Sequence, residues 1–288
     1  MDIDFPLILM VLTVGTGIVA LLDKLVFLPK RLREIDLLDG QGAAKEDLEL
    51  AAKEPMWIEQ SKSFFPVLAI VFVLRSFVAE PFQIPSGSME STLVKGDFIL
   101  VSKFHYGLRM PVFRNLLVAN NEPQRGDVMV FFPPHDKRYF IKRVIGLPGD
   151  HIQYKGGQLI INGEAQEIEL VGGEPEHRPL KYFLKEKLDA GEHEVQWTRE
   201  ITQNPQGKKV LVTNYGPEGE WTVPEGHYFM MGDNRGRSSD SRLWRDIASG
   251  EVMPFVPEEN IVGKAEAVWM FWDEFTSLPS FERNKAIH

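Results

Sequence analysis

The chain of 288 residues contains no cysteine. It therefore can form no disulfide, no thiolate nucleophile, no Cys-ligated zinc site and no iron–sulfur cluster. A domain of this size does not need disulfides to stay folded, so this absence does not identify the compartment. The chain also lacks a basic excess, because 32 Lys and Arg stand against 41 Asp and Glu, a formal net charge of −9. Nucleic acid is therefore not expected as a partner.

Motifs for binding metals and nucleotides are missing as well. The seven histidines are scattered, no HExxH pair occurs, and the sequence contains neither a Walker A nor a GxGxxG motif. We therefore expect no metal and no other cofactor. Because cysteine and a clear histidine partner are both missing, a nucleophile would have to be Ser or Thr with another base.

Charged residues are absent from 5–22, which reads FPLILMVLTVGTGIVALL. A helix needs about 17 to 25 apolar residues to cross a bilayer, so this run is long enough. A cleavable signal peptide or a buried core helix are the alternatives. A signal peptide would need a basic start and a small-x-small end, whereas this chain starts with Met-Asp-Ile-Asp. The sequence favours a retained transmembrane helix over 1–22 with its short N-terminus outside.

A second apolar run, SFFPVLAIVFVLRSFVA at 63–79, predicts another transmembrane helix over 63–81. Its Arg75 can extend to the headgroups from a helix end. The alternative is an amphipathic helix lying on the membrane. The stretch 23–62 carries seven Lys and Arg, and the N-terminal tail carries none. The positive-inside rule therefore predicts a cytosolic loop over 23–62 and everything after the second helix outside.

From residue 82 onward, short β-branched and aromatic runs alternate with turn residues, which is typical of antiparallel sheets. We expect a mainly β fold, with an antiparallel-sheet catalytic domain formed by 82–150 and 227–288. The more polar segment 151–226 reads as an inserted smaller β-rich domain. Within it, Asn162-Gly163 predicts a tight hairpin, and 180–188 alone suggests a helix.

Three stretches could carry chemistry, and each also has an ordinary explanation. The run IPSGSMESTL at 84–93 reads as a Ser/Gly turn, and GDNRGRSSDSR at 232–242 as a solvated loop with balanced charges. In YFIKRVIGLPGD at 139–150, a strand would place Phe140, Lys142 and Val144 on one face. Lys142 is either an edge-strand charge that prevents aggregation or a buried base with a lowered pKa.

Taken together, the chain resembles the type I signal peptidases, the bacterial leader peptidases, over nearly its whole length. Besides the two apolar segments, the resemblance rests on five ordered motifs: PSGSM at 85–89, GDFILV at 96–101, RGDV at 125–128, KRVIGLPGD at 142–150 and GDNRGRSSDSR at 232–242. It implies a serine endopeptidase with a Ser–Lys dyad, which cleaves signal peptides from exported preproteins after a small-x-small site. It also implies a multi-pass protein of the bacterial inner membrane whose catalytic domain faces the periplasm. Its partners would be preproteins, the lipid bilayer and, as a further candidate, the secretion machinery.

The resemblance also implies roles for individual residues. Ser88 would be the nucleophile and Lys142 the general base, with Ser86 adding a hydroxyl to an oxyanion hole. Ser238 would orient Lys142, and Asp240 with Arg242 would brace the loop that carries Ser238. Substrate would contact seven mostly apolar residues: Phe82, Ile84, Pro85, Met89, Leu93, Phe140 and Ile141.

Two departures from the family pattern concern local geometry. The family usually has proline where Ser91 stands, and we expect the change to loosen a turn. An extension of about ten residues follows Trp244 and leaves the local loop geometry open. Neither departure removes a catalytic group.

A working Lys142 must be neutral. An ordinary lysine has a pKa of about 10.4, and lowering it to about 8 costs about 3 kcal/mol. We expect desolvation by Phe140, Val144 and bound substrate to supply this shift, without a contribution from Arg143.

Two rival classes remain at this point. A penicillin-binding type acyltransferase would need Ser-x-x-Lys and Lys-Thr-Gly, but Lys142 follows Ser88 by 54 residues and Lys-Thr-Gly is absent. The other is a membrane-tethered β domain without enzymatic activity, which labelling of Ser88 by an acylating inhibitor would distinguish from an enzyme.

Overall fold

The structure is a computed structural model that describes residues 5–111, 115–174, 176, 179–204, 208–246, 249–274 and 276–288. The chain divides into two compact units. One comprises residues 1–78 with 110–113, and the other comprises 79–109 with 114–288.

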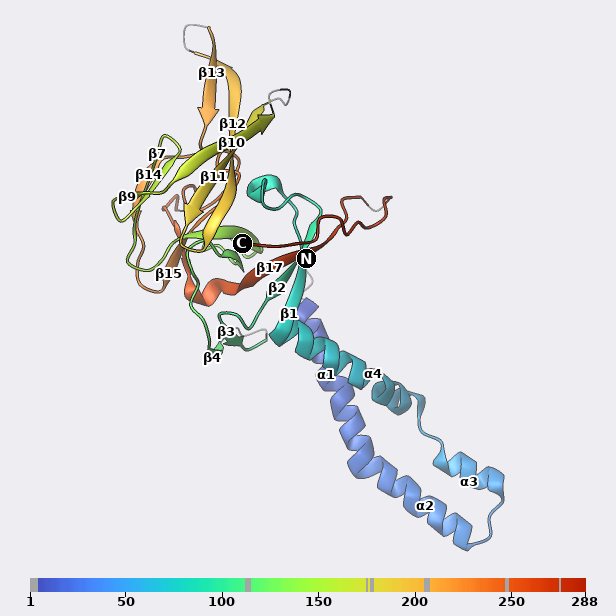
Figure 1. The fold of residues 1–288 in the computed structure, drawn as a ribbon. Helices are drawn as coiled ribbons and strands as arrows, with labels where there is room; N and C mark the ends of the chain where they lie inside the picture. The colour runs from blue at the N-terminus through green and yellow to red at the C-terminus, as the bar shows by residue number, and fades with distance from the viewer. Residues whose placement is uncertain are drawn as a thin grey trace. The chain divides into compact units, whose positions relative to one another are not determined.

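The first unit is helical (Figure 1). Its elements are α1 (Phe5–Leu22), a π-helical turn (Asp23–Phe27), α2 (Leu28–Gly40), α3 (Lys45–Ala52), α4 (Met56–Val73) and a second π-helical turn (Leu74–Val78). The continuous helical runs Phe5–Gly40 and Met56–Val78 are long and apolar enough to cross a membrane, with mean hydropathies of 2.4 and 1.6 in their most apolar windows. Within α1 and α4 most large apolar side chains are exposed, as is typical of lipid-facing helices.

A cluster of four charged side chains joins the end of α1 to the start of α4. Asp23 is buried and accepts hydrogen bonds from Arg31 at 2.7 Å and Lys62 at 3.1 Å. Glu54 accepts from the same two cations, at 3.2 and 2.7 Å. Each cation thus bridges two carboxylates, which compensates the cost of burying Asp23.

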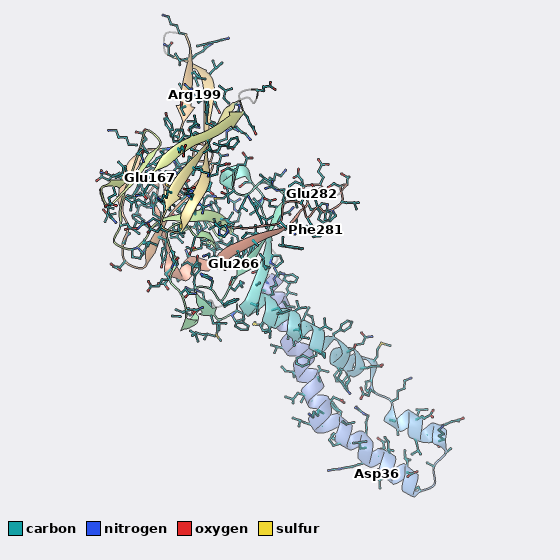
Figure 2. The ribbon with its side chains drawn as sticks, viewed as in Figure 1. Asp36, Glu167, Arg199, Glu266, Phe281 and Glu282 are labelled. Carbon is teal, nitrogen blue, oxygen red and sulfur yellow. The ribbon has the colours of Figure 1, made fainter. Side chains whose placement is uncertain are left out.

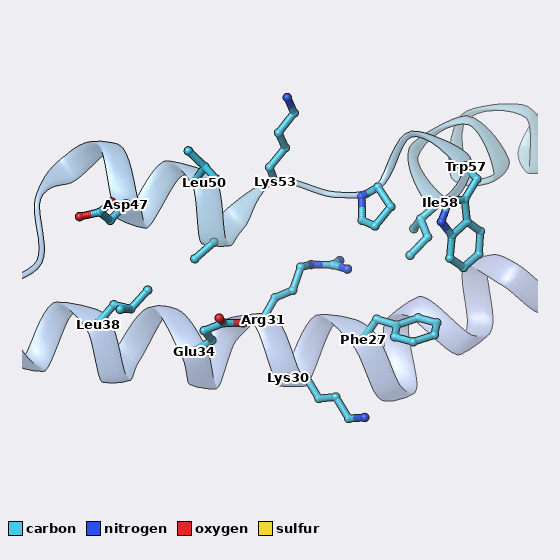
Figure 3. Close-up of a pocket in the computed structure, with 12 residues that line it drawn as sticks. Phe27, Lys30, Arg31, Glu34, Leu38, Asp47, Leu50, Lys53, Trp57 and Ile58 are labelled. Carbon is cyan, nitrogen blue, oxygen red and sulfur yellow. The ribbon is translucent and has the colours of Figure 1, made fainter.

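A cavity of about 670 Å³ lies beside this cluster, between α2, α3 and the start of α4. Figure 3 shows Arg31 extending from α2 into this space, whereas Lys30 and Lys53 point away from it. Apolar side chains such as Phe27, Leu38 and Ile58 form part of its wall. No residue of the predicted Ser–Lys dyad lines this cavity.

The second unit is built on a large antiparallel sheet of eight strands, in the order β1-β2-β17-β5-β6-β15-β16 with β18 paired to β17. The strands are β1 (Ala79–Gln83), β2 (Asp97–Ser102), β5 (Val128–Phe131), β6 (Phe140–Gly146), β15 (His227–Met231), β16 (Phe255–Pro257), β17 (Ile261–Phe271) and β18 (Lys285–Ala286). Short 3₁₀ turns lie at Gly87–Met89 and Glu258–Asn260. β1 is at one end of this order, so one of its edges has no strand neighbour among the described residues.

The strands between the two halves of this sheet form two further sheets of four strands each. One has the order β10-β11-β12-β13 and the other β14-β7-β8-β9, while β3 and β4 form a separate hairpin. Their bounds are β3 (Gly107–Arg109), β4 (Leu116–Ala119), β7 (His151–Lys155), β8 (Gln158–Ile161), β9 (Glu164–Ala165), β10 (Ile168–Glu174), β11 (Leu180–Leu188), β12 (Gly191–Gln203), β13 (Lys209–Asn214) and β14 (Gly219–Thr222). Figure 2 shows Glu167 and Arg199 in this region, on the approach to β10 and on β12.

Apolar side chains of the large sheet pack into buried clusters on its two faces. One cluster contains Ile84, Met89, Leu93 and Ile99, and a second contains Met129, Val144 and Trp244. The same strands thus provide both the core and the positions of the predicted dyad.

The mainly β, antiparallel fold with two apolar N-terminal helices is confirmed, but several expected details were wrong. The segment 180–188 is the strand β11, not a helix. The second apolar helix starts at Met56 rather than 63 and ends at Val78, so 79–81 belongs to β1. Most of the segment 23–62 is helical, and its position as a cytosolic connection between two membrane helices stays a prediction. The whole of 79–109 and 114–288 forms one compact unit, so the boundaries of an inserted domain at 151–226 stay a prediction.

Candidate active site

The turn that carries Ser88 follows the free-edged strand β1. Backbone hydrogen bonds from Ile84 N to Asp97 O at 2.8 Å and from Gly96 N to Ile84 O at 3.0 Å continue the β1–β2 pairing to this point. The chain then enters the 3₁₀ turn Gly87–Met89, whose Met89 side chain is buried in the core. The buried Met89 side chain anchors the turn to the core, and Ser88 remains partly exposed.

Lys142 comes from β6, in the interior of the same sheet, and meets Ser88 directly. Its Nζ lies 2.6 Å from Ser88 Oγ and 2.8 Å from the Ile141 carbonyl oxygen. Lys142 is only 4% exposed, and its Nζ lies 5.6 Å from the centre of the Phe140 ring. The fold thus brings together a hydroxyl and an amine that are 54 residues apart in the chain.

Burial dominates the electrostatics of this lysine. Desolvation lowers the pKa of Lys142 to about 8, although the carboxylates of Asp240 and Asp233 act in the opposite direction. The shift is of the size that the sequence argument required, and Arg143 is not among its causes. A substantial fraction of the lysine is therefore neutral near pH 8 and able to accept a proton from Ser88.

The two expected supporting serines differ in how they meet the dyad. Ser86 Oγ lies 3.5 Å from Ser88 Oγ and is exposed, as a group that meets an incoming substrate must be. Ser238 Oγ is buried, and among the described residues no hydrogen bond joins it to Lys142. It lies beside Gly232, where an added Cβ would overlap both Ser238 Oγ and the Ser88 backbone oxygen. The predicted orienting role of Ser238 stays a prediction.

Asp240 and Arg242 form a buried pair in the loop that contains Ser238. Arg242 donates from Nε and Nη2 to the Asp240 carboxylate at 2.8 and 2.7 Å, and from Nη2 to the Arg235 backbone oxygen at 2.9 Å. Asp240 also accepts from Gly232 N at 3.0 Å. Burial alone would raise the pKa of Asp240, but Arg242 and these hydrogen bonds outweigh it and lower that pKa. The carboxylate therefore stays ionised and cross-links the loop.

The loop 232–235 holds the Ser88 turn by its backbone and side chains. Asn234 donates from its backbone N to Ser88 O at 3.1 Å and from Nδ2 to Gly87 O at 2.9 Å. Asp233 accepts from Thr92 Oγ1 at 2.5 Å and forms a buried pair with Arg143 at 2.8 Å. Sequence analysis quoted this motif but assigned no role to Asp233, Asn234 or Arg143. Arg143 lies among apolar residues of the strand β6, where a charged side chain needs a buried partner, and this pattern is the signal that would have identified it. Asp233 and Asn234 lie in a loop, and no local sequence pattern marks their contacts.

A second buried pair joins this loop to the inserted strands. Arg235 donates to both carboxylate oxygens of Glu186 on β11, and His193 on β12 lies 3.3 Å from the same carboxylate. Burial would raise the pKa of Glu186, but Arg235 and His193 lower it well below its usual range. The backbones of Gln196 and Asn234 also form a parallel β-bridge. The residues 233–235 thus contact both the Ser88 turn and the strands β11 and β12.

Ser91 shows that the first departure from the family pattern is more than a loosened turn. Its φ is 75°, a left-handed conformation that the proline ring excludes. Its Oγ donates to the Glu194 backbone oxygen on β12 at 2.8 Å. This hydrogen bond ties the turn to β12.

The two described ends of the extension after Trp244 pair with each other. Arg245 and Val252 form an antiparallel bridge, and Met253 N donates to Trp244 O at 3.0 Å. Residues 247–248 lie outside the described part of the chain. Because the two ends of the extension meet, the buried Trp244 keeps its place in the core.

The predicted substrate contacts divide into two groups. Phe82, Pro85, Phe140 and Ile141 are at least partly exposed near the dyad. Ile84, Met89 and Leu93 are buried in the core cluster, with 2%, 0% and 0% exposure, and form no open surface. Core packing covers these three side chains in this structure, and their contact with substrate stays a prediction. Within the described residues, no group of three or more His, Asp or Glu side chains is arranged to hold a metal ion.

Comparison with known proteins agrees with this geometry. Residues 57–272 match the family described as signal peptidase, peptidase S26. The chain is 47% identical over 290 residues to signal peptidase I of Pseudomonas fluorescens, covering 98% of each chain. It is 46% identical over 295 residues to signal peptidase I of Pseudomonas aeruginosa, covering 100% of each. Signal peptidase I of Haemophilus influenzae is 36% identical over 315 residues, covering 92% of this chain and 85% of the relative. The chain therefore belongs to the signal peptidase family, peptidase S26.

Proposed function

We propose that this signal peptidase uses Ser88 as its nucleophile and Lys142 as its general base, and that it acts while anchored in a membrane by α1 and α4. Membership of the family supports the cleavage of signal peptides from preproteins. The observation that carries the finer proposal is the 2.6 Å separation of Ser88 Oγ and Lys142 Nζ, with the lysine buried. A buried lysine beside a serine is the arrangement that a Ser–Lys mechanism needs.

The reaction has two steps, acylation of Ser88 and hydrolysis of the acyl-enzyme, and in each step Lys142 first accepts a proton and then gives it back. Neutral Lys142 takes the proton of the Ser88 hydroxyl while Oγ attacks the scissile carbonyl carbon. The resulting oxyanion is stabilised by the Ser88 backbone N–H and the Ser86 hydroxyl. When the C–N bond breaks, the Lys142 ammonium gives its proton to the leaving amine. A water molecule then attacks the acyl-enzyme, passing its proton to Lys142, and Ser88 recovers its own as the product acid leaves.

The free edge of β1 supports binding of the substrate as an added strand. β1 has one neighbour in the large sheet, β2, and the Ser88 turn continues from it. An extended peptide paired along 83–86 would bring its scissile bond to Ser88, and its alternate side chains would face the protein. Phe82, Phe140 and Ile141 are the apolar side chains open to it, which favours a small uncharged residue before the cleaved bond.

Anchoring rests on the two helices of the first unit. The seven Lys and Arg of 23–62 assign that segment to the cytosol and the catalytic unit to the periplasm of a bacterial inner membrane. In that topology the substrates are exported preproteins inserted in the same bilayer, and the secretion machinery is the natural source of them.

The deciding experiment is processing of an exported preprotein by the purified full chain in detergent. Ser88→Ala and Lys142→Ala should each abolish the mature product, because removing either member disables the unit. Ser277→Ala and Lys155→Ala change the same residue types at exposed positions and should process like the wild type. Wild-type processing by Lys142→Ala, with an unchanged circular dichroism spectrum, would refute the dyad.

A further inference from the structure

The backbone N–H of Ser88 is the proposed donor to the oxyanion, and its direction depends on the peptide bond that joins Gly87 to Ser88. Ser88 is the second residue of the 3₁₀ turn Gly87–Met89, and the first N–H groups of such a turn have no partner within it. Among the described residues, none outside the turn accepts a hydrogen bond from this N–H. The N–H is therefore available to an oxyanion.

The carbonyl of Gly87 controls where the Ser88 N–H points. A trans peptide is planar, so its C=O and its N–H point in opposite directions, and holding one holds the other. Glycine leaves the rotation of this peptide freer than other residues would, because it has no Cβ to restrict the backbone. Within the turn, Glu90 N donates to Gly87 O at 3.1 Å, and a single 3₁₀ hydrogen bond of this kind has poor geometry. A second hydrogen bond to the carbonyl is therefore needed to fix the N–H.

Asn234 supplies this second hydrogen bond from a distant part of the chain. Its side-chain Nδ2 donates to Gly87 O at 2.9 Å and lies 3.4 Å from Glu90 Oε2. Its backbone N donates to Ser88 O at 3.1 Å, so Asn234 holds the carbonyl groups on both sides of the Ser88 Cα. Rotation of the Gly87–Ser88 peptide would break the bond from Nδ2. This bond therefore stabilises the orientation in which the Ser88 N–H points away from Asn234.

The backbone of Asn234 is itself fixed on both sides. Its neighbours Asp233 and Arg235 both form buried ion pairs, and Asn234 is only 1% exposed. Gln196 on β12 bridges the same two neighbours, because its N donates to Asp233 O at 2.8 Å and its O accepts from Arg235 N at 3.0 Å. A donor held in this way needs little reorganisation when charge develops on the substrate, as electrostatic stabilisation of an oxyanion requires.

Only the donor half of the Asn234 amide is used. Its Oδ1 is buried and has no hydrogen-bond partner among the described residues, which costs stability. The reverse orientation of the amide would place Oδ1 against Gly87 O, and two acceptors repel each other. An apolar side chain would avoid the unpaired acceptor but would lose the donor to Gly87. Stability alone therefore does not explain a buried amide at this position, whereas a need for its donor does.

We propose that Asn234 is a positioning residue of the oxyanion hole, which acts through the Gly87 carbonyl and fixes the direction of the Ser88 N–H. The inference rests on the proposed function, because it takes Ser88 as the nucleophile and its N–H as the oxyanion donor. Asn234 acts on the backbone of the turn and not on the side chains of the dyad. Its loss should therefore slow the chemical step and leave substrate binding and the titration of Lys142 unchanged.

The first test measures kcat and KM for a soluble peptide with the purified full chain in detergent. Asn234→Asp keeps the shape and the backbone N–H but cannot donate from an ionised side chain, and Asn234→Ala removes the amide without adding charge. Each should lower kcat by about 10- to 100-fold, somewhat less than loss of an oxyanion donor itself, and change KM by less than about threefold. For Asn234→Ala the rise of the rate with pH should keep its midpoint near pH 8, because Lys142 is untouched.

Asn214 offers a matched control. Its Nδ2 donates to the Gly236 backbone oxygen at 3.0 Å, in the loop that also carries Asn234, and within the described chain no hydrogen bond joins its side chain to the Ser88 turn. Asn214→Asp and Asn214→Ala should lower Tm but keep kcat within about twofold of the wild type. An equal fall of kcat in the Asn214 and Asn234 variants would show that loop stability, and not the direction of the Ser88 N–H, controls the rate.

Because the chain has no native cysteine, a reaction that forms no oxyanion gives a second readout. In Ser88→Cys the thiolate displaces iodide from the saturated carbon of iodoacetamide, and no carbonyl is attacked. Adding Asn234→Ala to Ser88→Cys should leave the alkylation rate within about twofold, although Asn234→Ala slows peptide cleavage. If alkylation slows as much as cleavage, the substitution displaces the turn or Lys142, and the oxyanion assignment is wrong.

Ser88→Ala separates this inference from the proposed function. If Ser88→Ala is inactive and Asn234→Ala cleaves the peptide like the wild type, the inference is wrong and the proposed nucleophile stands. If Ser88→Ala still cleaves the peptide, the proposed function itself fails.

Discussion

Lys142 combines the two properties that a general base in this reaction needs, proximity to the hydroxyl and a lowered pKa. Both have the same origin, because the position on β6 that brings Nζ within 2.6 Å of Ser88 Oγ also removes it from solvent. The desolvation that lowers the pKa to about 8 opposes folding by about 3 kcal/mol at neutral pH, at about 1.4 kcal/mol per pKa unit. The rest of the core therefore compensates the cost of burying Lys142.

The first prediction concerns pH. Because only neutral Lys142 can accept the Ser88 proton, kcat/KM should rise about tenfold per pH unit below the pKa of about 8 and become level above it. The measurement is cleavage of a soluble peptide from pH 6 to 10, with circular dichroism recorded at each pH to exclude unfolding. A rate that is flat from pH 6 to 9 would contradict the assignment of Lys142 as the base.

The second prediction concerns stability. In the unfolded chain Lys142 has an ordinary pKa near 10.5, so between pH 8 and 10.5 the unfolded state binds the proton that the folded state has released. Stability from this group therefore rises with pH across that window, and the penalty is fully present below pH 8. Lys142→Met should raise Tm at pH 7, and the gain should shrink towards pH 10. Lys155→Met, at an exposed position, should show no such pH-dependent gain.

The third prediction concerns Ser91. Ser91→Pro introduces the residue usual in the family but cannot adopt a φ of 75°, so it should lower kcat roughly tenfold or more and lower Tm. Ser91→Gly accepts the same φ and loses only the hydrogen bond to Glu194, so its effect should be about 1 kcal/mol or less. Thermal unfolding and peptide cleavage measure both variants. A Ser91→Pro protein as active and stable as wild type would show that the turn adopts the ordinary proline conformation.

At the scale of elements, residue pattern predicted much of the β structure. The Asn162-Gly163 hairpin is confirmed, with φ of 52° and 85° in the two-residue connection between β8 and β9. The segment 180–188 was misread because its buried face consists of Leu184, Glu186 and Leu188. Because a carboxylate interrupts this buried face, the sequence does not show the alternation of apolar and polar residues that is typical of a strand. Only the tertiary contact with Arg235 makes Glu186 an inward residue, and no local pattern contains that contact.

The fourth prediction tests this joint between β11 and the loop 232–235. Arg235→Met would leave the buried Glu186 carboxylate without its main partner and should destabilise the protein by about 3–5 kcal/mol. Adding Glu186→Leu to this variant removes the unpaired buried charge and should restore part of the lost stability. Thermal unfolding of the wild type, both single variants and the double variant gives the coupling. Additive single effects would show that the pair does not act as a joint.

At the scale of the whole molecule, the motifs predicted Ser88 and Lys142 as a dyad, but the geometry of the pair could not be predicted from the sequence. Ser88 and Lys142 were assigned by resemblance, whereas their separation and the burial of the lysine depend on the strand order of the large sheet. The same limit applies to Ile84, Met89 and Leu93, whose contact with substrate stays a prediction. Their apolar character is equally suited to a pocket wall and to a core, and only packing decides between the two.

The fifth prediction concerns topology and uses single introduced cysteines, which the cysteine-free chain allows. In intact cells a membrane-impermeant maleimide that crosses only the outer membrane should label Glu167→Cys and not Lys45→Cys, because 23–62 is assigned to the cytosol. After disruption of the cells both should react. Labelling of Lys45→Cys alone in intact cells would invert the proposed orientation.

The direct passage from the helical run ending at Val78 into β1 leaves no linker between the two. Ser88 follows Ala79 by nine positions, and an extended chain covers at most about 3.3–3.6 Å per residue. Ser88 therefore cannot move more than about 30 Å from the end of that helix. If the helix is anchored in a bilayer, as proposed above, the same limit confines cleavage to peptide bonds that lie close to the lipid surface.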